Sequence, residues 1–106
     1  MKDTKTVYVV CWGSAGQDDD GNSTAYSGVA GVYFFKDDAQ KRLEEYKNEC
    51  YEEITNNPED DAESKAYMKD NTKVYGSVED DYFEIDYPIG DVPCEIYIHI
   101  VEQNIV

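Results

Sequence analysis

Carboxylates are the side chains best placed to do chemistry in this sequence, because 24 Asp and Glu stand against 9 Lys and Arg. They concentrate in an expected long helix, in the segment after it, and in an expected strand with its preceding turn. Within these stretches they recur at the neighbour spacing of a helix or of one strand face, roughly 5–7 Å. The acids that we expect to form a partner-binding surface are Glu45, Glu49, Glu52, Glu53, Glu59, Asp60, Asp61, Glu79, Asp80, Asp81, Glu84 and Asp86.

An array of this kind suits a basic partner. A nucleic-acid groove lined with Lys and Arg is built to contact rows of phosphates, and carboxylates form strong charge-assisted hydrogen bonds with Arg. Few lysines interrupt the acids, although solubility alone would be served by fewer charges of mixed sign. The ten tyrosines supply side chains that are enriched at binding hot spots. The pattern therefore predicts a protein that competes with nucleic acid for a basic groove.

The net charge of −15 narrows the range of partners. Nucleic acids and anionic membranes are themselves negative and would be repelled. No stretch of the sequence approaches the roughly 20 apolar residues of a membrane span. We therefore expect no direct contact with nucleic acid or membrane. The alternative is a surface that is acidic only for solubility.

The usual catalytic, metal and phosphate patterns are missing from the sequence. His99 is the single histidine, and no Cys and His residues have zinc-ligand spacing. Residues 12–16, WGSAG, lack the G-x-S-x-G form, and no Gly-rich phosphate loop occurs. Residues 18–21, DDDG, resemble part of a calcium loop, but Gly16 and Ser27 would then fill its first and twelfth positions. We expect no catalytic residue, metal or cofactor, and hence no enzyme.

The elements that would position the acids begin with two strands. Residues 6–12, TVYVVCW, are apolar on both faces, which favours a place inside a sheet. Residues 13–28 are rich in Gly, Ser, Asn and Asp and are expected to form a long polar loop. A second strand is expected at residues 29–35, VAGVYFF.

Two helices are expected next. Residues 37–57 begin with Asp37 and Asp38, either of which could cap a helix. An apolar stripe at helical spacing follows, formed by Ala39, Leu43, Tyr46, Cys50 and Ile54. Residues 58–71 predict a shorter surface helix with Pro58 in its first turn and Asn57 as its cap.

Three strands complete the expected order, at residues 72–78, 81–87 and 94–102. In the middle one Phe83, Ile85 and Tyr87 alternate with polar residues, and Glu79 to Asp81 is expected to be a tight turn before it. In the last strand the inward residues are Cys94, Ile96, Ile98 and Ile100. We predict an α+β fold, a largely antiparallel sheet of four to five strands with one long and one short helix packed on one face.

Length and cysteine content indicate one domain in a reducing compartment. The 106 residues suit a single domain spanning 1–106, and 41% hydrophobic residues are enough for a core. Three widely spaced cysteines and no secretory signal predict a cytoplasmic protein with free thiols.

The order of three segments resembles a known class of small proteins. Residues 8–13 (YVVCWG), 31–46 (GVYFFKDDAQKRLEEY) and 82–87 (YFEIDY) are similar to small β-β-α-β proteins encoded by phages and bacteria. Size and acidity are also similar to phage-encoded inhibitors of host defence, notably anti-CRISPR proteins, many of which are compact acidic mimics of DNA. The resemblance implies a CRISPR effector as target and the bacterial host cytoplasm as location. The 13–28 and 58–70 segments depart from that class, so we expect them to hold the specific function.

Two other functions remain open from the sequence. One is a small structural or regulatory interaction domain whose acids serve only solubility. The other is a nucleotide or small-molecule binder that uses the Gly-rich residues 13–28. The sequence leaves the oligomeric state and the identity of the target open.

Overall fold

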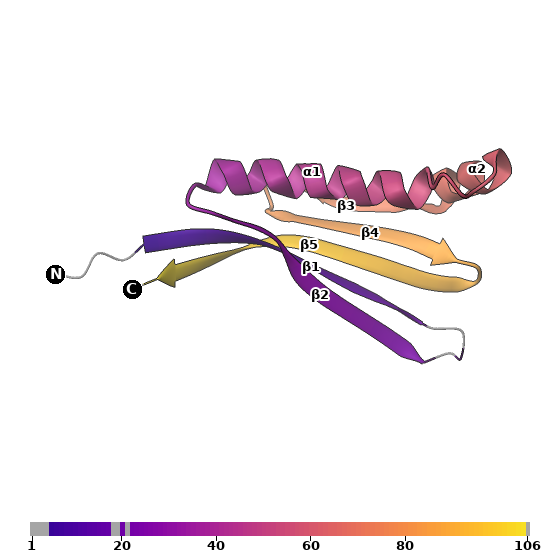
Figure 1. The fold of residues 1–106 in the computed structure, drawn as a ribbon, viewed down its shortest axis with the longest axis horizontal. Helices are drawn as coiled ribbons and strands as arrows, with labels where there is room; N and C mark the ends of the chain where they lie inside the picture. The colour runs from indigo at the N-terminus through magenta and orange to yellow at the C-terminus, as the bar shows by residue number, and fades with distance from the viewer. Residues whose placement is uncertain (1–4, 18–19, 21, 106) are drawn as a thin grey trace.

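A computed structural model describes residues 5–17, 20 and 22–105 of the chain. It confirms the α+β class, with a five-stranded sheet and two helices in the expected order. Both helices lie on one side of the sheet (Figure 1). The elements are β1 (Lys5–Gln17), β2 (Ser23–Tyr33), α1 (Lys36–Thr55), α2 (Ala62–Asn71), β3 (Lys73–Ser77), β4 (Tyr82–Ile89) and β5 (Val92–Ile105).

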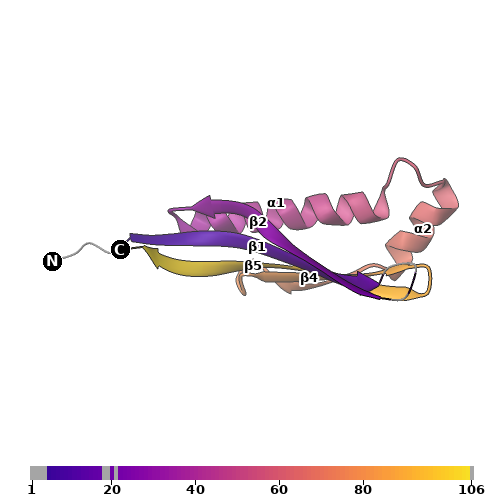
Figure 2. The same cartoon turned by 60° about the horizontal axis from the view of Figure 1, so that its bottom comes forward.

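The sheet is antiparallel throughout its described part. Its strand order is β2-β1-β5-β4-β3, so β2 and β3 are the two edges. The chain is elongated, with principal extents of 60 × 28 × 22 Å. We call the sheet side away from α1 the open face, because no described helix covers it in either view (Figures 1 and 2).

The core lies between α1 and the sheet. The predicted stripe on α1 is confirmed, since Ala39 and Leu43 are fully buried and Cys50 nearly so. The sheet contributes Val10, Ile85 and Ile98, which have no exposed surface. Burying these side chains away from water is the main stabilising term of such a domain. The predicted inward residues of the last two strands are confirmed as well.

The expected long loop at residues 13–28 is wrong. Strand β1 continues to Gln17 and β2 begins at Ser23, and the two pair antiparallel from Gly13↔Ser27 to Gln17↔Ser23. Gly, Ser and Ala are weak strand formers on their own, but backbone pairing with a neighbour overrides that weak preference. Asp18, Asp19 and Gly21 of the rejected calcium loop lie outside the described residues.

The second helix starts later than expected, and its predicted cap is wrong. Helix α2 begins at Ala62, and the carboxylate of Asp61 caps it by accepting a hydrogen bond from the Ser64 backbone N–H at 2.7 Å. Asn57 instead forms a local turn, in which its Oδ1 accepts from the backbone N–H of Glu59 at 2.9 Å. Short polar side chains of this type often hold turns ahead of helices. Residues 58–61 therefore lie outside the helix.

Candidate functional site

The predicted acids fall on separate parts of the molecule. Four of them, Glu45, Glu49, Glu52 and Glu53, lie exposed on α1. Glu59, Asp60 and Asp61 follow in the segment between α1 and α2, at the C-terminal end of α1. We call these seven residues the helical acidic surface. Glu45 to Glu53 span roughly 12 Å along α1, so this surface covers the C-terminal part of the helix and the segment that follows it.

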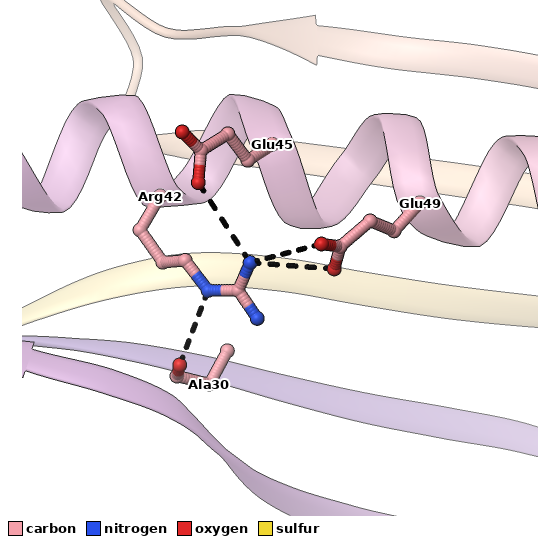
Figure 3. Close-up of polar contacts among 4 residues, drawn as sticks. All are labelled: Ala30, Arg42, Glu45 and Glu49. Atoms are coloured by element: carbon pink, nitrogen blue, oxygen red, sulfur yellow. Dashed lines mark hydrogen bonds and ion pairs between the residues drawn. The ribbon is translucent and has the colours of Figure 1, made fainter.

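Arg42 neutralises part of the helical acidic surface. Its Nη1 lies 3.2 Å from Glu49 Oε1 and 3.9 Å from Glu45 Oε2 (Figure 3). Exposed ion pairs of this kind contribute at most about 1 kcal/mol each. Among the described residues, no Lys or Arg forms an ion pair with Glu53 within 4 Å. Negative charge therefore dominates toward the C-terminal end of α1.

The acids Glu79, Asp80 and Asp81 occupy the turn between β3 and β4, as predicted. Asp81 has a positive φ of 56° and binds two residues of α1, with Lys36 Nζ at 3.1 Å and Gln40 Nε2 at 3.0 Å. Because Lys36 and Gln40 belong to the first part of α1, this turn lies at the opposite end of the helix from Glu59. Asp81 therefore has a structural role, while Glu79 is exposed.

Glu84 and Asp86 lie on the open face, away from the helical acidic surface. They alternate along β4 with Phe83 and Ile85, which are buried under α1. The register places Asp86 directly opposite Glu95 of β5 and Lys73 of β3. We call Glu84, Asp86 and Glu95 the open-face acids. Sequence reasoning missed Glu95: its place between Cys94 and Ile96 already puts it on the outward side, but only the register shows its neighbour.

Burial and neighbouring acids together raise the pKa of Asp86. Burial first, then a hydrogen bond with Glu84 and the charges of Glu84 and Glu95, raise the pKa of Asp86 to about 6. Lys73 opposes this rise. Asp86 Oδ1 is buried and has no hydrogen-bond partner. A carboxylate in such surroundings is poorly stabilised in the free protein.

Two tyrosines, Tyr82 and Tyr97, lie beside the open-face acids. Tyr82 donates a hydrogen bond to Glu84 Oε1 at 2.9 Å, and burial together with this contact raises the pKa of Tyr82 to about 12. Its ring lies 6.5 Å from the ring of Tyr97, centroid to centroid. Beside them a shallow hollow on the open face is lined by Cys11, Gly13, Val29 and His99 among others. The open face thus combines an acidic end with an aromatic and apolar middle.

No protein-family model matches the chain, and neither a curated protein nor a solved structure does. Within the described residues, no three His, Cys, Asp or Glu side chains come together as a metal-binding group. Neither described helix combines the length and apolar composition needed to cross a membrane. The two acidic surfaces are the features of the molecule that bear most directly on function.

Proposed function

We propose that the protein is a non-enzymatic inhibitor that occupies the basic nucleic-acid-binding groove of another protein, most concretely a CRISPR effector. The observation that carries this proposal is the presence of carboxylates on opposite faces of a narrow body measuring 60 × 28 × 22 Å. A nucleic-acid duplex also presents negative charge on all sides, and a groove that encloses a duplex would contact both surfaces.

The open-face acids give a physical reason for binding a cation-rich surface. Asp86, with a buried unpaired oxygen and a raised pKa, is held among like charges without enough cations nearby. An Arg or Lys from a partner would supply the missing charge and hydrogen bonds. Carboxylates whose pKa is shifted by burial and by neighbouring charges occur more often at functional sites than elsewhere. Binding would relieve a destabilising arrangement that the free protein maintains.

The helical acidic surface would add long-range attraction. Like charges gathered over roughly 12 Å of helix and the segment after it raise the rate at which an oppositely charged partner is encountered. This contribution falls with salt, because the Debye length shortens from about 10 Å at 0.1 M to about 3 Å at 1 M. Salt sensitivity is therefore the signature that separates this proposal from an acidic surface that serves only solubility.

The experiment is a gel-shift assay of a CRISPR effector with its guide and target DNA, in the presence of the full chain. The proposal expects the chain to displace DNA at low salt, about 0.05 M, and to lose most of this effect near 0.5 M. A capture experiment with bacterial lysate under the same two conditions extends the search to other basic proteins. Absence of any salt-sensitive basic partner in both experiments would contradict the proposal.

A matched pair of variants tests which acids act. Neutralising Glu53, Glu84 and Asp86 to their amides removes three charges from the proposed contact surfaces. Neutralising Asp70, Asp91 and Glu102 removes the same charge from other places on the chain. The first triple is expected to weaken inhibition at least tenfold and the second by much less. Equal effects would show that only the net charge matters.

A further inference from the structure

Residues 23–35 carry no charge and lie at an edge of the sheet, unlike the other long uncharged stretch, residues 6–17, which belongs to the inner strand β1. Residues 23–35, STAYSGVAGVYFF, contain no Asp, Glu, Lys or Arg, although these types make up 31% of the whole sequence. The segment forms edge strand β2 and the bend after it. Its exposed large apolar side chains are Tyr26, Val29, Val32, Phe34 and Phe35, each at least 59% exposed. An acidic protein thus keeps one sheet edge neutral and apolar.

Part of this edge is shielded by α1. The pairing of β2 with β1 shifts between Val10 and Cys11, whose partners are Gly31 and Val29, so Ala30 is an extra residue in a bulge. Arg42 Nε donates to the Ala30 carbonyl at 3.2 Å and holds this half of β2 against the helix (Figure 3). A bulge and a covering helix are two common ways of protecting a sheet edge.

The other half of β2 lacks that protection. Residues Ser23–Val29, which we call the free edge, run away from α1 in both views (Figures 1 and 2). They contain neither Pro nor a charged side chain, the residues that normally prevent pairing at an edge. The outer backbone groups of such a strand form a template for a further antiparallel strand.

We propose that the free edge pairs with the free edge of a second copy of this chain, antiparallel about a two-fold axis near Tyr26. This symmetry joins like surfaces, as in most homodimers, and places the two Tyr26 side chains close to each other across the axis. The two sheets would then continue into one. Cross-strand aromatic pairs favour such an arrangement.

The placement of charge favours a second copy as the occupant. Two chains of net charge −15 repel each other at most orientations. Among the open-face acids, Glu95 lies two strands from β2, and Glu84 and Asp86 lie three strands away, roughly 9 and 14 Å at the usual strand spacing. Both distances exceed the Debye length of about 8 Å at physiological salt. A basic partner would be drawn to the acids instead of an edge without charge. Asp20 lies in the turn before β2, and antiparallel pairing about Tyr26 would place its two copies at opposite ends of the contact. Repulsion between two acidic copies is therefore low at the free edge.

The size of the contact predicts a weak dimer. Seven residues of each strand would pair over roughly 23 Å, whereas a standard interface of about 800 Å² per partner involves roughly 20–30 residues on each side. We expect dissociation constants in the micromolar range and a dimer that forms as concentration rises. Higher salt is expected to strengthen the dimer, because it screens repulsion between the copies. This is opposite to the salt dependence of the proposed groove binding.

The test is sedimentation equilibrium of the full chain from about 5 to 500 µM at low and high salt, a range that brackets micromolar affinity. The mass should rise from one chain toward two, more readily at high salt. Hydrogen exchange at both ends of this range should show slower exchange in residues 23–29 and no change in 73–77. A mass of one chain throughout, or protection confined to β3, would overturn the proposal.

Two matched substitutions locate the contact. Tyr26→Lys places a charge on the free edge, whereas Tyr75→Lys makes the same change on β3, the opposite edge. Tyr26 is 66% exposed and Tyr75 48%, so neither change disturbs the core. We expect Y26K to weaken dimerisation at least tenfold and Y75K to leave it unchanged, with circular dichroism confirming folding. Neither variant removes an acid, so a failed dimer and a failed groove-binding proposal would be distinguished.

Discussion

Arg42 of α1 donates a hydrogen bond from Nε to the backbone carbonyl of Ala30 at 3.2 Å and so connects the long helix to edge strand β2 (Figure 3). The same guanidinium contacts Glu45 and Glu49 and lies 5.4 Å from the centre of the Tyr46 ring. One cation therefore stabilises the bulge of β2 and relieves repulsion on α1. Among the described residues, no other side chain makes a hydrogen bond between α1 and β2.

Replacing Arg42 by Ala should lower the free energy of unfolding by about 1–2 kcal/mol. The loss combines one hydrogen bond from a charged donor with partly exposed ion pairs. Urea unfolding measures it. Lys41→Ala is the control, since it removes the same charge from an exposed neighbour and should stay within about 0.5 kcal/mol. Equal losses in both variants would mean that only net charge is involved.

Asp86→Asn should stabilise the protein at neutral pH. The folded-state pKa of Asp86, about 6, lies above its ordinary value of 3.8. The fold thus favours the protonated form: its contribution is fully present below about pH 4 and is lost as pH rises through 6. We expect a gain of about 1 kcal/mol at pH 7.5, well below the full shift because solvent screens the carboxyl.

Urea unfolding at pH 4 and pH 7.5 checks this prediction. The gain should disappear at pH 4, where Asp86 is already largely protonated. Asp91→Asn removes the same charge from the exposed β4–β5 turn and serves as the control. A loss of stability in D86N at pH 7.5 would show that the carboxylate is satisfied in the free protein.

Gly76→Ala should destabilise the fold by about 1–3 kcal/mol. Gly76 has a φ of +96°, a conformation that L residues rarely adopt, and an added Cβ would collide with the backbone carbonyl of Tyr82. Gly90 also has a positive φ, of 61°, but a Cβ there meets nothing within 4 Å. Gly90→Ala should therefore cost about 1 kcal/mol or less. Thermal unfolding of both variants measures the two effects separately, because Gly90→Ala introduces only backbone strain whereas Gly76→Ala adds the collision with Tyr82.

Leu43→Ala should cost about 3–5 kcal/mol, because Leu43 is fully buried between α1 and the sheet and its removal leaves a cavity. Glu44→Ala, at the next and exposed position, should change the unfolding free energy by less than about 0.5 kcal/mol. Chemical denaturation gives both values. A small loss for L43A would indicate that the helix contributes little to the stability of the sheet.

Side-chain periodicity predicted most of the elements correctly. The stripe from Ala39 to Ile54 spaces apolar groups at helical intervals, and Phe83 and Ile85 alternate as a strand with one buried face requires. Each of these patterns is local, because a helix or strand repeats within a few residues. The continuation of β1 and β2 into the expected loop at residues 13–28 was not predicted, since the pairing of Gly13 with Ser27 depends on the partner backbone more than on either side chain.

The sequence by itself determined the abundance of carboxylates, the helical row on α1 and the outward direction of Glu84 and Asp86. Only the tertiary structure decided that these groups lie on opposite sides of the sheet and that Glu95 stands beside Asp86. It also decided that Asp61 and Asp81 are used inside the fold, as a helix cap and as a tie to α1. The physical reason is that charge and periodicity are properties of the chain, whereas strand order and register arise from long-range pairing of the backbone.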